Sequence, residues 1–352
     1  MLFTDSVPHN ICILRVSAIG DVINVVPVVR AIQEQSVDTK ITWVCGKSEH
    51  KILAGIEGVR FVILDKAAGL RGYRDLKREL AGEQFDVLLH MQTSARANLA
   101  STCIRAAVRL GWDKSRSREL HQFFVNRQIQ SITQQHQVQG LLSFARALGL
   151  QANEPHWDLP VSQASKEFAN KILPGEQPTL LISPCSSHVL RNWPAQRYAA
   201  IADYAIDNLA MRVLLTGGSS EFEASMGEAI EQSMVNEPIN LIGKDTLAQF
   251  LALLQQTDVV LSPDSGPLHL ANALGKPVIG LYACTYSRRS GPYNSLDLCV
   301  DKFTVAARLF LNKKPQDLRW GTRIEQKGVM NLIQVEEVIE QLEQAIRYRG
   351  QQ

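Results

Sequence analysis

The sequence predicts an α/β protein made of two consecutive α/β sandwiches, each with a parallel sheet. With 352 residues, the chain is too long for one ordinary hydrophobic core and suits two domains. Short strand-like apolar runs alternate with stretches of helical periodicity, a pattern typical of parallel sheets covered by helices. A linker with two prolines, residues 153–160, interrupts this alternation. We expect one domain over residues 1–155, a second over 156–334 and a C-terminal helix over 335–352.

In the first half, apolar runs predict four buried strands. The spacing of Val22 through Ile32 is helical, but Pro27 lies inside that stretch, so a kink or break is expected there. The alternation weakens over 111–134 and resumes with a helix over 135–148. The four expected strands are Ile11–Val16, Ile41–Cys45, Arg60–Leu64 and Phe85–His90.

The second half repeats the pattern after the linker. Thr246 and Gln249 have the spacing of a capping box at the start of a helix. Strands are expected at Thr179–Ser183, Arg212–Thr216, Ile239–Leu241, Val259–Ser262 and Val278–Tyr282. Helices are expected over 194–207, 221–233, 246–256, 265–274 and 335–348.

Composition narrows the class of protein. A content of 45% hydrophobic and 20% charged residues is that of a globular protein and excludes disordered and collagen-like chains. No apolar run is long enough for a transmembrane segment, and no secretion signal is recognisable. The cysteines do not form a Cys-x-x-Cys pair, which argues against zinc and disulfides and favours a cytoplasmic location. The six cysteines are Cys12, Cys45, Cys103, Cys185, Cys284 and Cys299.

Charge is unevenly distributed between the halves. Residues 1–155 hold 19 Lys and Arg against 14 Asp and Glu, whereas residues 156–352 hold 18 against 21. Arginines dominate the basic excess over 96–127, and arginine suits bidentate capture of carboxylate or phosphate. An anionic partner for the first half is therefore expected. Nucleic acid is not favoured, because no aromatic residues interleave with the cations.

Ligands of open α/β sheets bind beyond the carboxyl ends of strands, so the loops there are candidate sites. The first such loop, residues 17–21, has one glycine rather than Gly-x-Gly-x-x-Gly, which disfavours a nicotinamide or flavin dehydrogenase. It does place Asp21 at a helix start. Asp21 could be a catalytic carboxylate or simply a helix cap.

The next two loops carry small polar residues. Ser186, Ser187, His188 and Arg191 lie in one loop and could form an anion cradle, although a polar surface loop is the alternative. Thr216 and Gly217 begin a glycine-containing turn that would let a ligand approach closely, or would serve only as a turn.

The fourth loop gives the strongest signal. A strand ends near Ser262, and a helix begins at Ser265 or Gly266, so free backbone N–H groups would bind a phosphate. Pro267 suits the first helical turn. His269 could add a hydrogen-bond donor or could be a core histidine.

Four segments together resemble the lipopolysaccharide heptosyltransferases: Asp-Ser-Gly-Pro-Leu-His-Leu-Ala at 264–271, Gly-Leu-Tyr at 280–282, Arg-Val-Ser-Ala-Ile-Gly-Asp-Val at 15–22 and Arg-Asn-Trp-Pro at 191–194. They occur in the family's order over essentially the whole chain. The resemblance implies the GT-B fold, in which two Rossmann-like domains face each other across a cleft and the C-terminal helix returns to the first domain. It implies inverting transfer of a heptose from ADP-heptose to the Kdo-bearing lipid A inner core.

Site roles follow from that resemblance by position. Asp21 matches the family's catalytic aspartate, expected to act as general base. Arg191 stands where the family usually has lysine and would steady the diphosphate leaving group. The expected nucleotide-sugar residues are Ser186, Ser187, His188, Thr216, Gly217, Asp264, Ser265, Gly266, Pro267 and His269, and the expected acceptor residues are Gln92, Ser94, Arg96 and Arg118.

The resemblance has a departure and leaves alternatives. Where the family often has Gly-Pro-Thr after the last core strand, this chain has Ala283-Cys-Thr285, which resembles a less-studied branch. No Asp-x-Asp motif is present, so no metal or other cofactor is expected. The expected partners are the ADP-sugar and a lipid A acceptor at the inner face of the inner membrane, where the protein would be peripheral. A GT-B nucleotide-sugar epimerase and a non-catalytic protein that binds anionic glycolipid are the competing interpretations.

Overall fold

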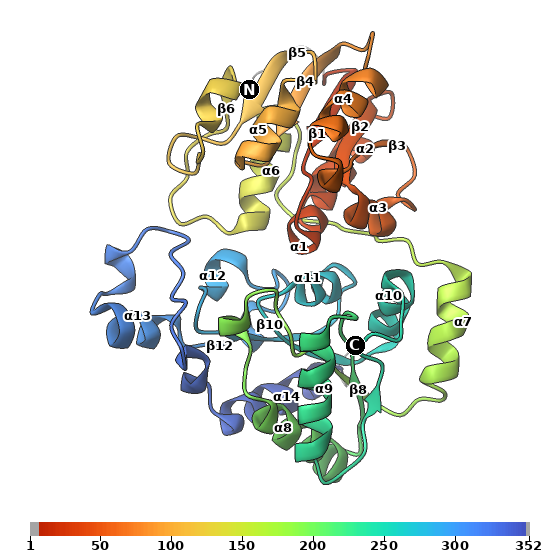
Figure 1. The fold of residues 1–352 in the computed structure, drawn as a ribbon, viewed down its shortest axis with the longest axis vertical. Coiled ribbons are helices and arrows are strands. Elements are labelled where there is room, and N and C mark those ends of the chain that lie inside the picture. The colour runs from red at the N-terminus through yellow and green to blue at the C-terminus, as the bar shows by residue number, and fades with distance from the viewer. Residues whose placement is uncertain (1–6, 350–352) are drawn as a thin grey trace. The chain divides into compact units, whose positions relative to one another are not determined.

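The computed structural model describes residues 7–349. The chain divides into two compact units, the first ending at Pro160 and the second beginning at Val161. In Figure 1 the first unit runs from red to yellow and the second from green to blue. The division falls within a few residues of the expected boundary at 155–156, at the end of the proline-containing linker.

The first unit contains a six-stranded parallel sheet in the order β3-β2-β1-β4-β5-β6. Alternate residues of a strand point to opposite faces, and here both faces are buried. Cys12 and Leu14 pack with Leu76 and Ala100 on one face, whereas Ile11 and Ile13 are buried on the other. The strands are β1 (Asn10–Leu14), β2 (Lys40–Gly46), β3 (Val59–Leu64), β4 (Phe85–His90), β5 (Ala106–Gly111) and β6 (Arg127–Gln128).

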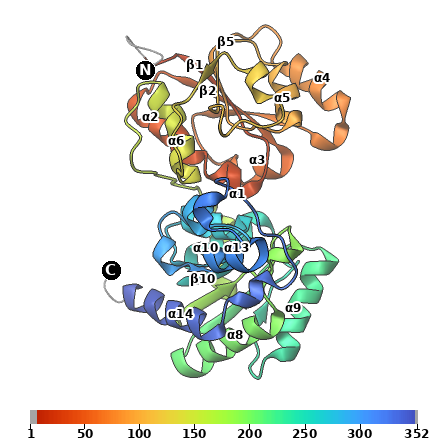
Figure 2. The ribbon, with the colours of Figure 1, turned by 90° about the vertical axis from the view of Figure 1, so that its left-hand side faces the viewer.

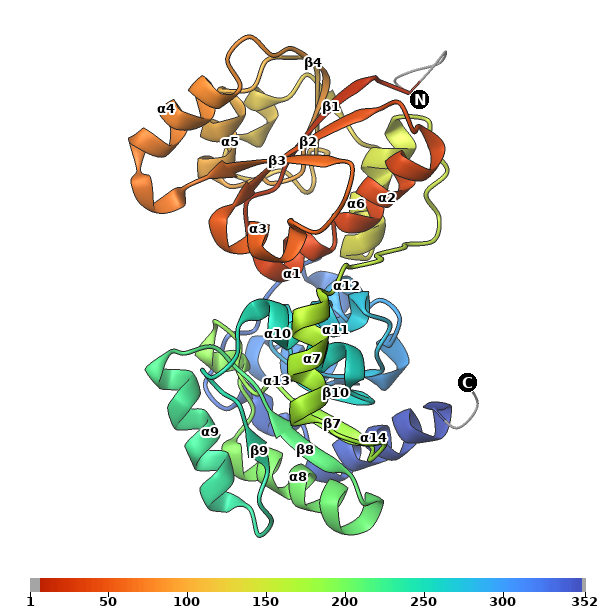
Figure 3. The same cartoon turned by 90° about the vertical axis from the view of Figure 1, so that its right-hand side faces the viewer.

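Helices cover both faces of this sheet. Helices α2 and α6 pack against each other, as Figures 2 and 3 show. The helices of the first unit are α1 (Ile19–Ile23), α2 (Val26–Gln35), α3 (Lys47–Leu53), α4 (Leu70–Glu79), α5 (Ala95–Ser101) and α6 (Gln137–Ala147), with short 3-10 turns η1 (Lys66–Ala68) and η2 (His121–Phe124).

The second unit repeats the same topology. Its strand order, β9-β8-β7-β10-β11-β12, is that of the first unit with each strand number raised by six. The strands are β7 (Thr179–Ile182), β8 (Arg212–Leu215), β9 (Ile239–Asn240), β10 (Val259–Pro263), β11 (Val278–Tyr282) and β12 (Val300–Asp301). All of them are parallel.

The helices of the second unit are α7 (Gln163–Ile172), α8 (Ala195–Leu209), α9 (Glu221–Ser233), α10 (Leu247–Gln256), α11 (Gly266–Ala273), α12 (Ser287–Ser290), α13 (Phe303–Leu311) and α14 (Val335–Arg349). The 3-10 turns are η3 (Val189–Arg191), η4 (Leu296–Leu298), η5 (Pro315–Asp317) and η6 (Val329–Leu332).

The C-terminal helix expected over 335–352 is present as α14, which lies against α8 and β11 of the second unit. The reason is its apolar face, because Val338, Leu342 and Ala345 are fully buried in that unit's core. Residues 350–352 of the expected segment lie outside the described part of the chain.

Other differences concern short elements. The expected interruption at Pro27 is a break: α1 ends at Ile23, and Pro27 occupies the first turn of α2, where its missing N–H costs no hydrogen bond. The six-residue strand β5 was not expected, the weak region over 111–134 contains the two-residue β6, and β12 is equally short. Two-residue strands leave too little sequence for a periodic signal.

The shared strand order fixes where the loops of each unit meet. In the first unit, successive strands are added to one side of β1 as far as β3, and then to its other side from β4 onward. The switch point therefore lies between β1 and β4, and the corresponding point of the second unit lies between β7 and β10. The carboxyl ends of strands at such a switch point form the usual ligand crevice of open α/β sheets. Most candidate residues follow these four strands, whereas Arg118 follows β5 and Thr216 and Gly217 follow β8.

Candidate functional site

Asp21 lies on α1, directly after β1, and its carboxylate is held by three partners. Nη2 of Arg15 lies 2.8 Å from Oδ2, the amide N–H of Ala18 donates to the same oxygen over 3.3 Å, and the side chain of Gln137 donates to Oδ1. The side chain keeps 36% of its surface exposed. The bond from Ala18 is a helix-capping contact, so Asp21 does cap the helix, as one of the two expected roles requires. Its ion pair with Arg15 is an additional contact that capping does not need.

The electrostatics of Asp21 follow from these contacts. Burial alone would raise the pKa of its carboxyl, but the positive charge of Arg15 and the hydrogen bonds from Gln137 and Ala18 outweigh burial. The net effect is a pKa below the usual range. Asp21 is therefore a carboxylate at neutral pH, the form that a general base requires.

Gln92 and Ser94, two expected acceptor residues, have structural contacts. Gln92 accepts the amide N–H of Val16 over 2.8 Å and donates to the hydroxyls of Ser17 and Ser94 over 3.1 Å each. Ser94 also caps α5 by accepting the N–H of Ala97. Gln92 thus joins the loop after β4 to the loop after β1, which contains Ser17 and leads to Asp21, and Ser94 links Gln92 to the start of α5.

Arg96 and Arg118, the expected acceptor cations, are exposed. Arg96 lies in the first turn of α5. The loop that contains Arg118 contacts the start of the same helix, because the carboxylate of Glu119 accepts the amide N–H of Ala95. The two arginines therefore belong to one neighbourhood of the first unit.

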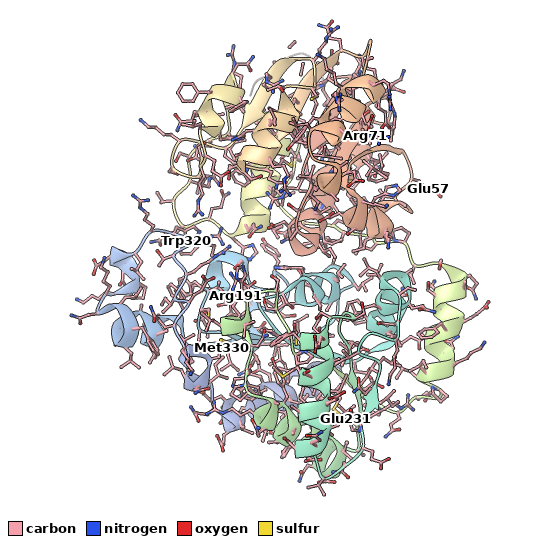
Figure 4. The ribbon with its side chains drawn as sticks, viewed as in Figure 1. Glu57, Arg71, Arg191, Glu231, Trp320 and Met330 are labelled. Atoms are coloured by element: carbon pink, nitrogen blue, oxygen red, sulfur yellow. The ribbon has the colours of Figure 1, made fainter. Side chains whose placement is uncertain are left out.

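In the second unit, Arg191 is buried between two carboxylates. Its Nη1 lies 3.4 Å from Oδ2 of Asp264, and its Nη2 lies 3.4 Å from Oε1 of Glu325. The arginine side chain is only 10% exposed, and its Nε is buried without a hydrogen-bond partner. Figure 4 labels Arg191 on η3, the turn that follows β7.

Asp264 also faces His269, whose Nε2 lies 3.9 Å from Oδ1. On the other flank, Nδ1 of the half-exposed His188 lies 4.0 Å from the Glu325 carboxylate. The structure thus brings together four expected residues, His188, Arg191, Asp264 and His269, and adds Glu325.

The start of α11 lies beside this cluster. Ser265 is the N-cap residue, but its hydroxyl hydrogen-bonds to Ser262 over 2.8 Å and does not cap the helix. Pro267 lies in the first turn, as expected, and Gly266 begins the helix. Because Ser265 does not cap them, the first backbone N–H groups of α11 remain available to an anionic ligand.

The remaining donor-side residues line two neighbouring loops. Ser186 is buried and fixes its loop, because its N–H donates to Asn192 and its hydroxyl accepts from the N–H of His188. Ser187 is exposed. After β8, Thr216 is fully buried and its Oγ1 has no hydrogen-bond partner, while the carbonyl of Gly217 accepts from Gly243.

Sequence reasoning missed four contributors: Arg15, Gln137, Glu119 and Glu325. Arg15 was part of a recognised segment, but no role was inferred for it. Gln137 and Glu325 reach their partners across 116 and 134 residues of chain, and neither stands in a recognisable motif. Glu325 is brought in because the N–H of Ile324 donates to the carbonyl of Cys284 in the loop after β11.

The described residues, 7–349, contain neither a membrane-spanning helix nor a cluster of metal ligands. No helix in that range is long and apolar enough to cross a membrane. Within the same residues, no group of three or more His, Cys, Asp or Glu side chains is arranged to hold a metal ion.

Two parallel α/β units with polar loops at their switch points are the architecture of the GT-B fold. The chain belongs to glycosyltransferase family 9 (heptosyltransferase), whose family description matches residues 73–312. It is 39% identical over 341 residues to the lipopolysaccharide core heptosyltransferase OpsX of Haemophilus influenzae, with 97% of this chain and 98% of that protein covered.

Solved structures support the same fold. A glycosyl transferase family 9 protein from Veillonella parvula superposes with a TM-score of 0.78 at 19% identity, covering 97% of both chains. Escherichia coli heptosyltransferase WaaC with ADP gives a TM-score of 0.73 at 18% identity, covering 96% of this chain and 99% of that one. The expected GT-B fold, family and glycosyltransferase activity are confirmed, and neither the epimerase nor the binding-protein interpretation is favoured.

Proposed function

We propose that this glycosyltransferase moves a heptose from ADP-heptose to the Kdo-bearing inner core of lipid A, with inversion at the anomeric carbon. The similarity to a lipopolysaccharide core heptosyltransferase extends over nearly the whole of both chains. The solved E. coli relative is a complex with ADP.

The observation that carries the donor assignment is the position of Arg191 beside the start of α11. Asp264, the residue before the N-cap of that helix, contacts Nη1 of Arg191. A diphosphate placed there would meet a guanidinium and the positive end of a helix dipole, and both stabilise the charge of a leaving ADP. We infer that transfer needs no metal ion, because these groups can supply the charge stabilisation that a cation would otherwise give.

The acceptor assignment depends on the first unit. Arg96 and Arg118 are exposed cations near the loops that hold Asp21. Kdo carboxylates and lipid A phosphates are the anions such arginines recognise. A lipid-borne acceptor would bring the protein to the surface of a membrane.

Asp21 is the proposed base. Its carboxylate would take the proton from the acceptor hydroxyl while that oxygen forms a bond to the anomeric carbon and the bond from that carbon to ADP breaks. Arg15 keeps the base ionised, and the hydroxyl proton becomes acidic only as the new bond forms.

A transfer assay with ADP-heptose and Kdo-bearing lipid A, read by mass spectrometry with and without EDTA, tests the proposal. We expect the acceptor to gain one heptose at the same rate in both. Isomerisation of ADP-heptose alone would support an epimerase, and loss of transfer in EDTA with recovery on adding magnesium would contradict the metal-free site.

A further inference from the structure

Two large apolar side chains of the first unit are presented to solvent in one turn. Leu120 is 70% exposed and Phe123 is 83% exposed. The N–H of Phe123 donates to the carbonyl of Leu120 over 3.0 Å, so the two residues belong to one turn at η2. We refer to these two residues as the apolar tip; they lie between β5 and β6, which Figure 1 labels.

A buried polar network holds the apolar tip in place. His121, between the two tip residues, is fully buried, and its Nδ1 donates to Oδ1 of Asn98 over 3.0 Å. The amide N–H of Trp112 donates to Nε2 of the same ring over 3.3 Å. Nδ2 of Asn98 donates to the carbonyl of Glu119 over 2.8 Å, which fixes the residue just before the tip.

The backbone of the tip is also unusual. Glu119 and Leu120 have φ values of 49° and 61°, in the left-handed region that non-glycine residues rarely adopt. Such a conformation persists only where surrounding contacts impose it. The network around His121 therefore holds a leucine and a phenylalanine outward at a conformational cost, although an unconstrained loop would let them fold back onto the surface.

Two exposed arginines lie near the apolar tip. Arg118 lies two residues before Leu120, and Arg96 lies on α5, against which η2 packs. Asp113 is paired with Arg116, whereas the Glu119 carboxylate accepts the N–H of Ala95 and keeps its negative charge. The two exposed arginines therefore outnumber the one exposed carboxylate beside the tip.

We propose that the apolar tip inserts into the interface of an anionic lipid bilayer while the neighbouring arginines contact its headgroups. Exposed apolar side chains beside exposed cations are the features that bind a protein to the surface of an anionic membrane without crossing it. Two side chains bury far less than the roughly 800 Å² per partner of a stable protein interface, which disfavours a protein occupant. The inference rests on the proposed function in one respect: the first unit, which carries the apolar tip, is also the unit proposed to bind the lipid-borne acceptor.

A second exposed apolar pair provides a matched control. Val305 and Leu309 of α13 are 42% and 66% exposed and lie one helical turn apart in the second unit, with Arg308 beside them. Their removal deletes exposed apolar surface in the other unit, less than the tip presents, without touching the tip. Trp320, labelled in Figure 4, lies farther along the same segment, where its ring contacts Tyr286.

The test is co-sedimentation of the whole protein with vesicles of phosphatidylglycerol and phosphatidylethanolamine, compared with vesicles of phosphatidylcholine alone. The tip variant combines Leu120→Asn, since asparagine tolerates the left-handed conformation, with Phe123→Ser. The control variant combines Val305→Ser with Leu309→Ser. We expect wild-type and control proteins to bind the anionic vesicles, and the tip variant to bind them about 10- to 100-fold more weakly at an unchanged melting temperature.

A second readout separates this inference from the proposed function. With acceptor embedded in the anionic vesicles, the tip variant should transfer heptose more slowly than wild type, whereas with a deacylated, water-soluble acceptor the two should be equal. If no acceptor is glycosylated but anionic-vesicle binding still depends on the tip, the proposed function fails and the membrane surface stands. Wild-type binding no stronger to anionic than to phosphatidylcholine vesicles, or loss of binding in the control variant alone, would overturn the inference.

Discussion

Arg15 and Asp21 form an ion pair of 2.8 Å at the end of β1, and Arg15 also donates from Nη1 to the carbonyl of Met91 at the end of β4. The arginine therefore connects the two strands at the switch point and holds the carboxylate there. Arg15 is only 11% exposed and Asp21 is 36% exposed, so solvent screens the ion pair only in part. The position and the charge of Asp21 thus depend on the same neighbour.

Asp21→Asn separates a catalytic role from helix capping. The amide oxygen can still accept the N–H of Ala18, so loss of capping alone would change stability by at most about 2 kcal/mol. As the base, Asp21 is expected to contribute about 10²- to 10⁴-fold to kcat. Turnover and thermal unfolding of the variant check this, with ADP binding as the control. Near-normal kcat would leave the proton acceptor unidentified, and His188 would be the next candidate.

Arg15→Gln should shift the acidic limb of the pH–rate profile. The arginine lowers the pKa of Asp21, so its removal lets burial raise that pKa. The base is then protonated at a higher pH, and activity is lost earlier as the pH falls. The measurement is kcat/KM against pH for both proteins. An acidic limb at the wild-type position, with only the plateau lowered, would show that Arg15 acts by positioning alone.

Arg191→Met should weaken ADP binding by about 10- to 100-fold, because a charge-assisted contact to the diphosphate is lost. Glu325→Gln keeps the size of the side chain and removes one carboxylate from Arg191, so ADP affinity should stay the same or rise. Titration calorimetry with ADP measures both. Equal weakening in the two variants would mean that Glu325 is needed to orient Arg191.

Arg96→Glu and Arg118→Glu should each raise KM for the acceptor and leave ADP affinity unchanged. Both arginines are exposed in the first unit, so charge reversal is not expected to disturb a core. Steady-state kinetics with varied acceptor, together with ADP titration, check the prediction. A fall in ADP affinity would place these cations on the donor side.

Acid should destabilise the first unit through His90 and His121. Both rings donate to Oδ1 of Asn98, and burial lowers the pKa of both, that of His121 to about 4. The unfolded chain takes up these protons near pH 6.5, so the stability that the neutral rings contribute is complete above about pH 6.5 and is lost as pH falls towards about 4. For His121 alone this loss is on the order of 3 kcal/mol.

Hydrogen exchange of the β4 and β5 amides, compared at neutral and mildly acidic pH, measures the stability of the first unit by itself. His121→Gln should show a smaller difference between the two pH values than wild type, although the variant is less stable at both. An equal pH dependence in the two proteins would assign the acid sensitivity to other groups.

Local patterns were sufficient to predict the long elements. The capping box of Thr246 and Gln249 is present at α10, and the central strands of both sheets lie within a residue or two of the expected bounds. Burial on both faces gives such strands continuous apolar runs, which are visible without knowledge of the neighbours. The expected position of Asp21 after the first strand followed from the same signal.

Local sequence patterns could not predict the contacts between segments that are distant in the chain. Periodicity does not reveal strand order, and the order decides which loops meet. The adjacency of β1 and β4, for example, ties the side chain of Gln92 to Val16 and Ser17, and no local pattern predicts these contacts. Glu325 reaches Arg191 from a segment without regular structure, where no residue pattern marks its place.

The identical strand order of the two units has a consequence for the nascent chain. In each sheet the first strand to be synthesised is central, so β1 and β7 emerge before either neighbour and wait for the pairing that follows. Every ladder of the first sheet is complete once β6 has left the ribosome, and no strand of the second sheet takes part in it. The two halves can therefore fold one after the other during translation, with the proline linker separating the two episodes.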